Sequence, residues 1–210
     1  MPTASIPKRR ASEAEMDLPL SVLFQVTATL EQQNISYLLV GSFASSIHGM
    51  YRSTADIDIL ADIQPEQIRP LSDVLQNSFY VDEHAMRDAV AQGRSFNAIH
   101  FDSVFKVDIF IAKGDEFALS QLKRRQLRRL SAEKDQMVYI ATAEDTVLAK
   151  LRWYRAGHET SATQWNDVLG VLGTSLSSLN VEYLHIWAGK LGVDDLLQKA
   201  VDAVQEESDL

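Results

Sequence analysis

The sequence contains no cysteine and no long apolar run, and both absences narrow what the protein can be. Without cysteine, neither disulfide bonds nor thiolate chemistry is available. Such a composition is typical of a cytoplasmic protein, and we expect that location. No apolar run reaches the roughly 18–20 residues that cross a bilayer, so no membrane association is expected. The basic residues 8–10 are followed by acidic residues at 13, 15 and 17, which excludes a secretory signal.

An excess of positive charge is also lacking. Lysine and arginine number 20 against 29 aspartates and glutamates, which gives a formal net charge of −9. Sequence-independent binding of nucleic acid relies on neutralising phosphates, so this balance argues against it, while a local basic groove stays open. The 210 residues, 46% of them hydrophobic, are enough to bury a sizeable core.

The most informative stretch is residues 37–63. Its apolar run, Tyr37–Val40, ends abruptly at Gly41 and Ser42, and a short amphipathic segment follows. This pattern predicts a strand, a tight turn and the start of a helix. A helix N-terminus presents free N–H groups and partial positive charge, which suits phosphate. The plainer alternative is a turn with Ser42 as helix cap. The stretch lacks the glycine spacing and lysine of a P-loop, so a Walker-type site is not supported.

Two carboxylates, Asp56 and Asp58, interrupt the second β-type run of this stretch. Side chains two positions apart in a strand point to the same face, so these two stand side by side while Ile57 and Ile59 point into the core. Two like charges about 4 Å apart repel by roughly 4 kcal/mol at an effective dielectric near 20. A hard divalent cation such as Mg²⁺ would offset that repulsion.

A third carboxylate, Asp108, follows on a separate strand. Residues 96–101 and 104–111 are two β-type runs that predict a hairpin. In the second run, Lys106, Asp108 and Phe110 alternate with apolar residues and share the face opposite the isoleucines. Aspartate is depleted in strands, which favours a metal site over three unrelated solvent-facing side chains.

The hydrophobic-Gly-Ser junction, the Asp-x-Asp strand and the third aspartate together resemble the nucleotidyltransferase superfamily typified by DNA polymerase beta. Within that superfamily, these motifs are most similar to those of the small prokaryotic proteins of the minimal and AbiEii-toxin-like branches. It covers roughly residues 35–170, and the thirteen residues between Ser42 and Asp56 are at the long end of what the family tolerates. The resemblance implies that Asp56, Asp58 and Asp108 hold two Mg²⁺ ions, with Mn²⁺ as an alternative, and that Gly41 and Ser42 bind the NTP phosphates.

Further binding candidates lie around this motif. Arg52 could pair with triphosphate oxygens through its planar guanidinium. His48 could contact substrate or simply bond to a backbone carbonyl. The family resemblance adds Lys150 as a phosphate ligand, against the alternative of a surface lysine paired with nearby acids. It also adds Asp167, for which helix packing or capping is an equal alternative. The remaining histidines show no metal-ligand spacing.

The predicted fold class is α+β, with a small mixed, mainly antiparallel sheet that has flanking helices on one side and is followed by a helical C-terminal unit. We expect a disordered tail over residues 1–17, a nucleotidyltransferase core over 18–141 and a helical subdomain over 142–210. A helix over residues 115–129 would end in a basic cluster, at which a solvated helix end and a phosphate or RNA contact are both open.

Two functions follow. The first is Mg²⁺-dependent transfer of a nucleoside monophosphate from an NTP to an acceptor that the sequence does not name: a protein, a tRNA end or a small molecule. The second is a toxin–antitoxin or regulatory binding protein that keeps the fold with weak or no catalysis. A cognate partner protein fits either function.

Overall fold

The computed structural model describes residues 9–49, 56–130 and 136–208. The strands in these residues are β1 (Ser36–Val40), β2 (Asp56–Asp62), β3 (Phe79–Tyr80), β4 (Ser95–His100), β5 (Lys106–Ile111), β6 (Gln126–Arg129) and β7 (Met137–Ile140). The α-helices are α1 (Arg9–Gln32), α2 (Gly41–His48), α3 (Ile68–Leu75), α4 (Glu83–Gln92), α5 (Glu116–Arg124), α6 (Ala143–Ala156), α7 (Ala162–Ser175), α8 (Val181–Leu191) and α9 (Asp194–Ser208). Two 3₁₀ turns are η1 (Pro65–Gln67) and η2 (Leu176–Ser178).

The strands form one mixed sheet in the order β3-β4-β5-β2-β1-β7-β6. Strand β2 pairs antiparallel with β1 and parallel with β5, so it lies between these two strands. The predicted hairpin is present, because β4 and β5 pair antiparallel. The α+β fold class is therefore confirmed. The regular geometry of paired strands places the side chains of β2 and β5 next to each other.

Both faces of the sheet are covered, as alternation along β1 shows. Tyr37 and Leu39 face a core shared with α1, α3 and α4, whereas Leu38 faces a second cluster with Ala44 of α2 and Ala118 of α5. Strand β1 is therefore buried on both faces, as its nearly continuous apolarity favours. The expectation of helices on one side is wrong, since α2 and α5 carry small apolar residues that pack against the second face.

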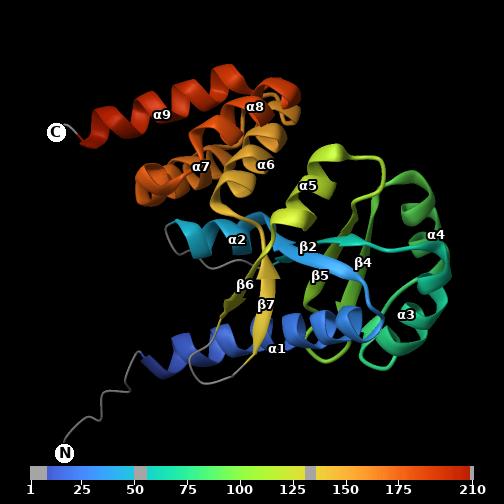
Figure 1. Cartoon of the computed structure of the whole chain (residues 1–210). Coiled ribbons are helices and arrows are strands. Elements are labelled where there is room, and N and C mark those ends of the chain that lie inside the picture. The colour runs from blue at the N-terminus through green and yellow to red at the C-terminus, as the bar shows by residue number, and fades with distance from the viewer. Residues whose placement is uncertain (1–8, 50–55, 131–135, 209–210) are drawn as a thin grey trace, which may run out of the picture.

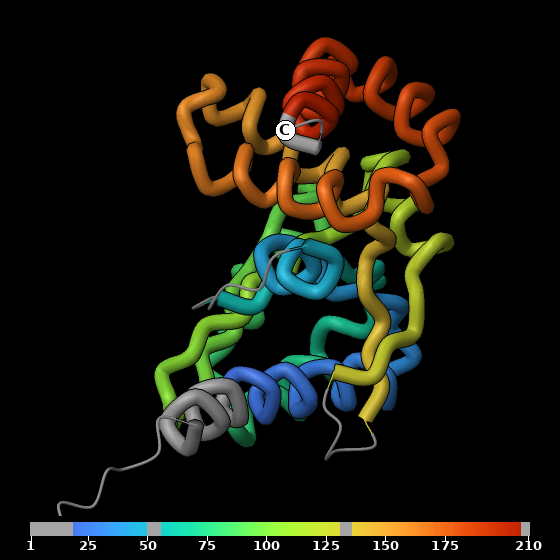
Figure 2. Tube along the Cα trace, turned by 90° about the vertical axis from the view of Figure 1, so that its left-hand side faces the viewer, coloured from blue at the N-terminus to red at the C-terminus, as the bar shows by residue number. Residues whose placement is uncertain are grey.

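The C-terminal helices α6–α9 gather in one cluster on the side of the sheet away from α1 (Figures 1 and 2). They build a core of their own from apolar residues spaced along each helix, and Phe117 of α5 joins it. Helix α6 begins after Thr142, whose hydroxyl caps it by accepting a hydrogen bond from the Asp145 N–H. Among the described residues, no helix combines the length and apolarity needed to cross a membrane.

Two boundaries differ from the prediction. Of the expected tail over residues 1–17, residues 1–8 lie outside the described part, and the rest belongs to α1. The expected helix over residues 115–129 ends at Arg124, and Gln126–Arg129 pairs with β7 as strand β6. A longer helix would stack Arg124 on Arg128 at i,i+4, which is unfavourable for like charges. Strand pairing with β7 avoids that repulsion.

Candidate functional site

The turn between β1 and α2 is shaped by Gly41. Its φ of +64° lies in the left-handed region, which L side chains rarely adopt. A Cβ atom built there would lie 1.9 Å from Oδ2 of Asp58. The glycine is therefore required twice, for the turn and for the close approach of the Asp58 carboxylate. Val40 at the helix N-cap supplies no side-chain acceptor, so the first N–H groups of α2 keep no side-chain cap.

Lys150 reaches this turn from α6. Its ammonium lies 3.4 Å from the Ser42 hydroxyl and 2.7 Å from Oδ2 of Asp167, and the lysine is only 4% exposed. The structure thus brings together Gly41, Ser42 and Lys150, which the sequence proposed as phosphate ligands. Asp167 on α7 is the residue that holds the lysine in place, and charge pairing at this burial explains how an ammonium is tolerated there.

The three aspartates lie on neighbouring strands. Asp56 and Asp58 are on β2, with Ile57 fully buried on the opposite face. Asp108 is on β5, and its Cα is paired with that of Asp58 in the parallel register. Directly opposed residues on paired strands have Cβ atoms roughly 5 Å apart. The register therefore places the third carboxylate beside the Asp-x-Asp pair.

Burial and an excess of negative charge around Asp58 both raise the pKa of its carboxyl group. Burial raises the pKa of the Asp58 carboxyl, and the nearby carboxylates of Asp108 and Asp56 raise it further. The ammonium groups of Lys150 and Lys106 oppose that rise but do not cancel it. The raised pKa reflects an excess of negative charge around Asp58 as well as its burial, and such an excess favours binding of a cation there.

Lys106 is the cation among these carboxylates. Its ammonium lies 2.8 Å from Oδ2 of Asp108 and 3.9 Å from Oδ1 of Asp56. It shares a face of β5 with Asp108 because the two are two positions apart, and its Cα is paired with that of Asp56. The alternation along this strand predicts the face on which Lys106 lies but gives the residue no role. The Lys-x-Asp spacing was the available signal.

The donor set fits Mg²⁺ or Mn²⁺ chemically, since it consists of three carboxylates on adjacent strands whose mutual repulsion a divalent cation would relieve. As they stand, however, no three acidic or histidine side chains converge closely enough to hold an ion anywhere in residues 9–49, 56–130 and 136–208. Lys106 occupies the charge-compensating position instead. Asp56, Asp58 and Asp108 are the residues that could hold a metal at this point of the sheet.

A cleft of about 840 Å³ opens from this point and runs between the sheet and α6. Gly41, Ser42, Asp58 and Lys150 line it. Trp153 also lines it, is 58% exposed and packs edge-on against Phe110 with ring centroids 6.3 Å apart. The volume of the cleft is within the range of small-molecule and cofactor sites, and Trp153 and Phe110 offer a surface on which a flat ring could stack.

Gln121 of α5 is a lining residue that sequence reasoning missed. It is 5% exposed, and its Oε1 atom finds no hydrogen-bond partner among the described residues. An unsatisfied buried amide oxygen costs free energy, so a ligand donor or a water is needed there. A lone glutamine in a helix gives no sequence signal of such a role.

Two other candidates have different outcomes. Arg52 lies outside the described residues. The His48 ring lies 2.7 Å (Nε2) from the Ala141 carbonyl oxygen, which is the backbone contact that the sequence left open. Burial lowers the pKa of His48, so the ring is neutral and donates to that carbonyl.

The far end of α2 is held by α7. The Thr174 hydroxyl donates to the His48 carbonyl at 2.5 Å. A Cβ built on Gly49 would lie 2.9 Å from the backbone carbon of Gly170, so the two backbones meet where neither residue has a side chain. The helix that carries Ser42 is thus fixed at both ends, by β1 and by the C-terminal helices.

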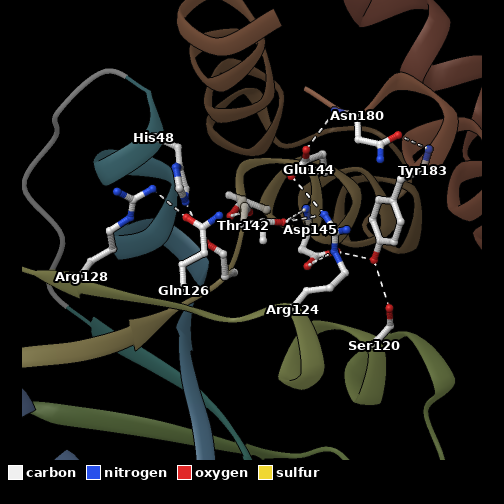
Figure 3. Close-up of polar contacts among 12 residues, drawn as sticks. His48, Ser120, Arg124, Gln126, Arg128, Thr142, Glu144, Asp145, Asn180 and Tyr183 are labelled. Carbon is white, nitrogen blue, oxygen red and sulfur yellow. Dashed lines mark hydrogen bonds and ion pairs between the residues drawn. The ribbon is translucent and has the colours of Figure 1, made fainter. Parts of the chain in front are cut away.

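A polar network joins α5, α6 and α8 (Figure 3). The guanidinium of Arg124 lies over the Tyr183 ring at 3.6 Å and 3.4 Å from Oδ2 of fully buried Asp145. The Tyr183 hydroxyl donates to Asp145 at 2.6 Å, and the Asn180 N–H donates to Glu144 at 2.9 Å. Arg124 belongs to the basic cluster noted in the sequence, and its role here is to connect helices.

No protein-family model matches the chain, and no curated protein matches it. Solved structures do. The crystal structure of ANT(2'')-Ia in complex with adenylyl-2''-tobramycin superposes with a TM-score of 0.54 at 13% identity, covering 83% of this chain and 97% of that one. The solution structure of the same antibiotic-resistance factor gives 0.50 at 12% identity, covering 91% and 97%. An antigenic nucleotidyltransferase-like protein from Paracoccidioides brasiliensis gives 0.51 at 14% identity, covering 90% and 93%.

Proposed function

We propose that this chain, which has the nucleotidyltransferase fold, transfers a nucleoside monophosphate from an NTP to an acceptor hydroxyl or phosphate. The observation that carries the proposal is that a group of phosphate-binding donors and a group of carboxylates lie next to each other at the cleft. The turn at Gly41 and Ser42, with Lys150 above it, supplies donors and positive charge for phosphate. Asp58 touches that turn and is paired in register with Asp108, which supplies the acidic half.

In this proposal the chain mainly positions and neutralises, as nucleotidyl transfer requires. The first N–H groups of α2, the Ser42 hydroxyl and the Lys150 ammonium bind the triphosphate. Asp56, Asp58 and Asp108 would hold Mg²⁺, or Mn²⁺ in its place. When bound, the metal neutralises the charge that develops on the reacting phosphates.

The reaction itself forms one bond and breaks one. The acceptor oxygen attacks the α-phosphorus of the NTP, and the bond from that phosphorus to the bridging oxygen breaks, so that pyrophosphate leaves. Asp108 accepts the proton of the acceptor hydroxyl, since it is the carboxylate on the strand beside the Asp-x-Asp pair. Lys150 and Ser42 stay on the departing phosphates.

The acceptor belongs to the same proposal. One structure of similar fold holds an adenylylated tobramycin, so a hydroxyl of a small molecule is a candidate acceptor for this chain too. A protein side chain and a tRNA end are the others. We propose the AbiEii-toxin-like branch as the sequence group, with a cognate partner protein and a cytoplasmic location.

Nucleotide binding tests the first half of the proposal. Isothermal titration of the full chain with each NTP in the presence of Mg²⁺ should give binding to at least one nucleotide. Asp58→Ala should weaken that binding because it removes a proposed ligand of the Mg²⁺ that neutralises the triphosphate. Asp88→Ala on the exposed face of α4 is the matched control and should bind as the wild type does. Absence of binding, or binding unaffected by Asp58→Ala, would overturn the enzyme proposal and favour a binding protein with this fold.

Transfer tests the second half. Incubating a cell lysate with the protein and α-³²P-NTPs should label one macromolecular or small-molecule fraction, which identifies the acceptor class. Asp108→Ala should abolish that label while the melting temperature stays close to that of the wild type. Label that persists in Asp108→Ala would show that the proton acceptor is another group.

A further inference from the structure

Lys106 is the feature that the proposed function does not use. Its ammonium is 2.8 Å from Asp108 and 3.9 Å from Asp56, so it connects the carboxylates of two strands. Its hydrogen bond to Asp108 raises the pKa of Lys106, and the charges of Asp56, Asp58 and Asp108 all add to that rise. The lysine therefore carries a positive charge that all three proposed metal ligands stabilise.

The geometry explains why these carboxylates tolerate one another without a metal. Lys150, the other ammonium that acts on Asp58, is engaged by Asp167 at 2.7 Å from the opposite side of the turn. Lys106 is left to neutralise Asp108, whose side chain is only 18% exposed. A charge-assisted hydrogen bond at 2.8 Å is among the stronger polar contacts in proteins.

An ammonium and a divalent cation compete for the Asp108 carboxylate, because two positive charges a few ångströms apart repel each other. The Lys106 side chain is 39% exposed and has a flexible four-carbon stem, so it can leave towards solvent.

We propose that Lys106 is a positioning residue that takes the place of the metal in the metal-free protein, so that a divalent cation binds only by displacing it. The inference rests on the proposed function, since the ligands are the same aspartates. Its consequence is weak metal binding in the absence of nucleotide. The triphosphate reverses this, because it adds negative charge that favours the metal over the single charge of lysine.

The test measures Mn²⁺ binding to the metal-stripped full chain, without nucleotide, by electron paramagnetic resonance of the free ion. Lys106→Met keeps the aliphatic stem and removes the charge. We expect its Mn²⁺ dissociation constant to fall about tenfold, which corresponds to about 1.4 kcal/mol. Lys106→Arg keeps the charge and should bind as the wild type does. Lys113→Met, at an exposed position beyond the end of β5, is the control for lost net charge and should change little.

A thermal melt of the same proteins gives a second readout. Without metal, Lys106→Met should melt lower than the wild type because its carboxylates repel one another, and added Mn²⁺ should raise its melting temperature more. Lys106→Gln replaces Lys106→Met in both measurements if the latter does not fold. With a non-hydrolysable NTP present, the difference in Mn²⁺ affinity between wild type and Lys106→Met should shrink.

The outcomes separate this inference from the function on which it rests. Equal or weaker Mn²⁺ binding by Lys106→Met, in a protein whose Mn²⁺ binding still falls in Asp58→Ala, overturns the role of Lys106 and leaves the proposed function standing. Mn²⁺ binding that is insensitive to Asp58→Ala overturns the metal site itself.

Discussion

Replacing Gly41 with alanine most directly tests whether the turn at Gly41 and Ser42, where we propose that phosphate binds (the phosphate turn), must lie against Asp58. The residue adopts φ +64°, which costs an L side chain about 1–2 kcal/mol. The new Cβ would also lie 1.9 Å from Oδ2 and 2.9 Å from Cβ of Asp58. A new Asp58 rotamer moves Oδ2 away at a cost of about 1 kcal/mol, but the contact between the two Cβ atoms is relieved only by a backbone shift. We expect a loss of at least roughly 2–3 kcal/mol in the free energy of unfolding.

The more telling effect is on binding. For a chain of this length, that loss lowers the melting temperature by roughly 5–10 °C, so Gly41→Ala should still be folded at 25 °C. Its displaced Asp58 carboxylate should nevertheless abolish detectable binding of NTP with Mg²⁺ by isothermal titration. Circular dichroism melts and titrations on the same sample separate the two effects.

A matched control exists in the chain. Gly192 ends α8 at φ +68°, and a Cβ built there meets nothing within 4 Å. Gly192→Ala therefore carries the backbone penalty alone and should bind nucleotide as the wild type does. The reasoning is refuted if Gly41→Ala also binds normally, or if both variants lose binding together.

Three further predictions concern the groups that hold the site in place. Lys150→Met removes the buried ammonium that pairs with Asp167 and should lower the free energy of unfolding in urea by about 1–3 kcal/mol. The double variant with Asp167→Leu should regain most of that stability without regaining NTP binding, and equal stability of the single and double variants would contradict this. Tyr183→Phe removes the 2.6 Å hydrogen bond to fully buried Asp145 and should cost about 1–3 kcal/mol in urea unfolding; a loss below about 0.5 kcal/mol would show that the bond is unimportant. Burial lowers the pKa of His48, so its ring binds a second proton less tightly in the folded chain than in the unfolded chain. The stability linked to the neutral ring is complete above about pH 6.5 and is lost as the pH falls from there through the lowered pKa of His48. His48→Asn should therefore show a shallower fall in the free energy of unfolding between about pH 7 and pH 5 than the wild type, and an unchanged slope would assign that fall to other groups.

The parts of this fold that follow from the sequence are those set by short-range patterns. The alternation around Asp56 and Asp58 fixes which side chains share a face, and it is independent of the rest of the chain. Gly41 and Ser42 mark a strand-to-helix turn for the same local reason. The hairpin that carries Asp108 follows from two β-type runs separated by two polar residues.

The remaining features depend on contacts between distant segments. Residues 126–129 read as the end of a helix, and only pairing with β7 makes them a strand. The register that sets Asp108 beside Asp58 is a property of two strands 50 positions apart, which single-sequence patterns do not encode. The burial of Lys150 against Asp167 requires α6 and α7 to pack, and the lysine alone looks like a surface residue.

The hold of α7 on the end of α2 has a consequence for how this protein can be altered. Gly49 meets the backbone at Gly170, and Thr174 binds the His48 carbonyl, so the helix bearing Ser42 is seated partly on the C-terminal third of the chain. That third cannot be treated as an interchangeable module. A chimera that takes its C-terminal helices from a protein of similar fold would have to import the matching α2 with them, because a Cβ at Gly49 would lie only 2.9 Å from the backbone of Gly170 and Val171.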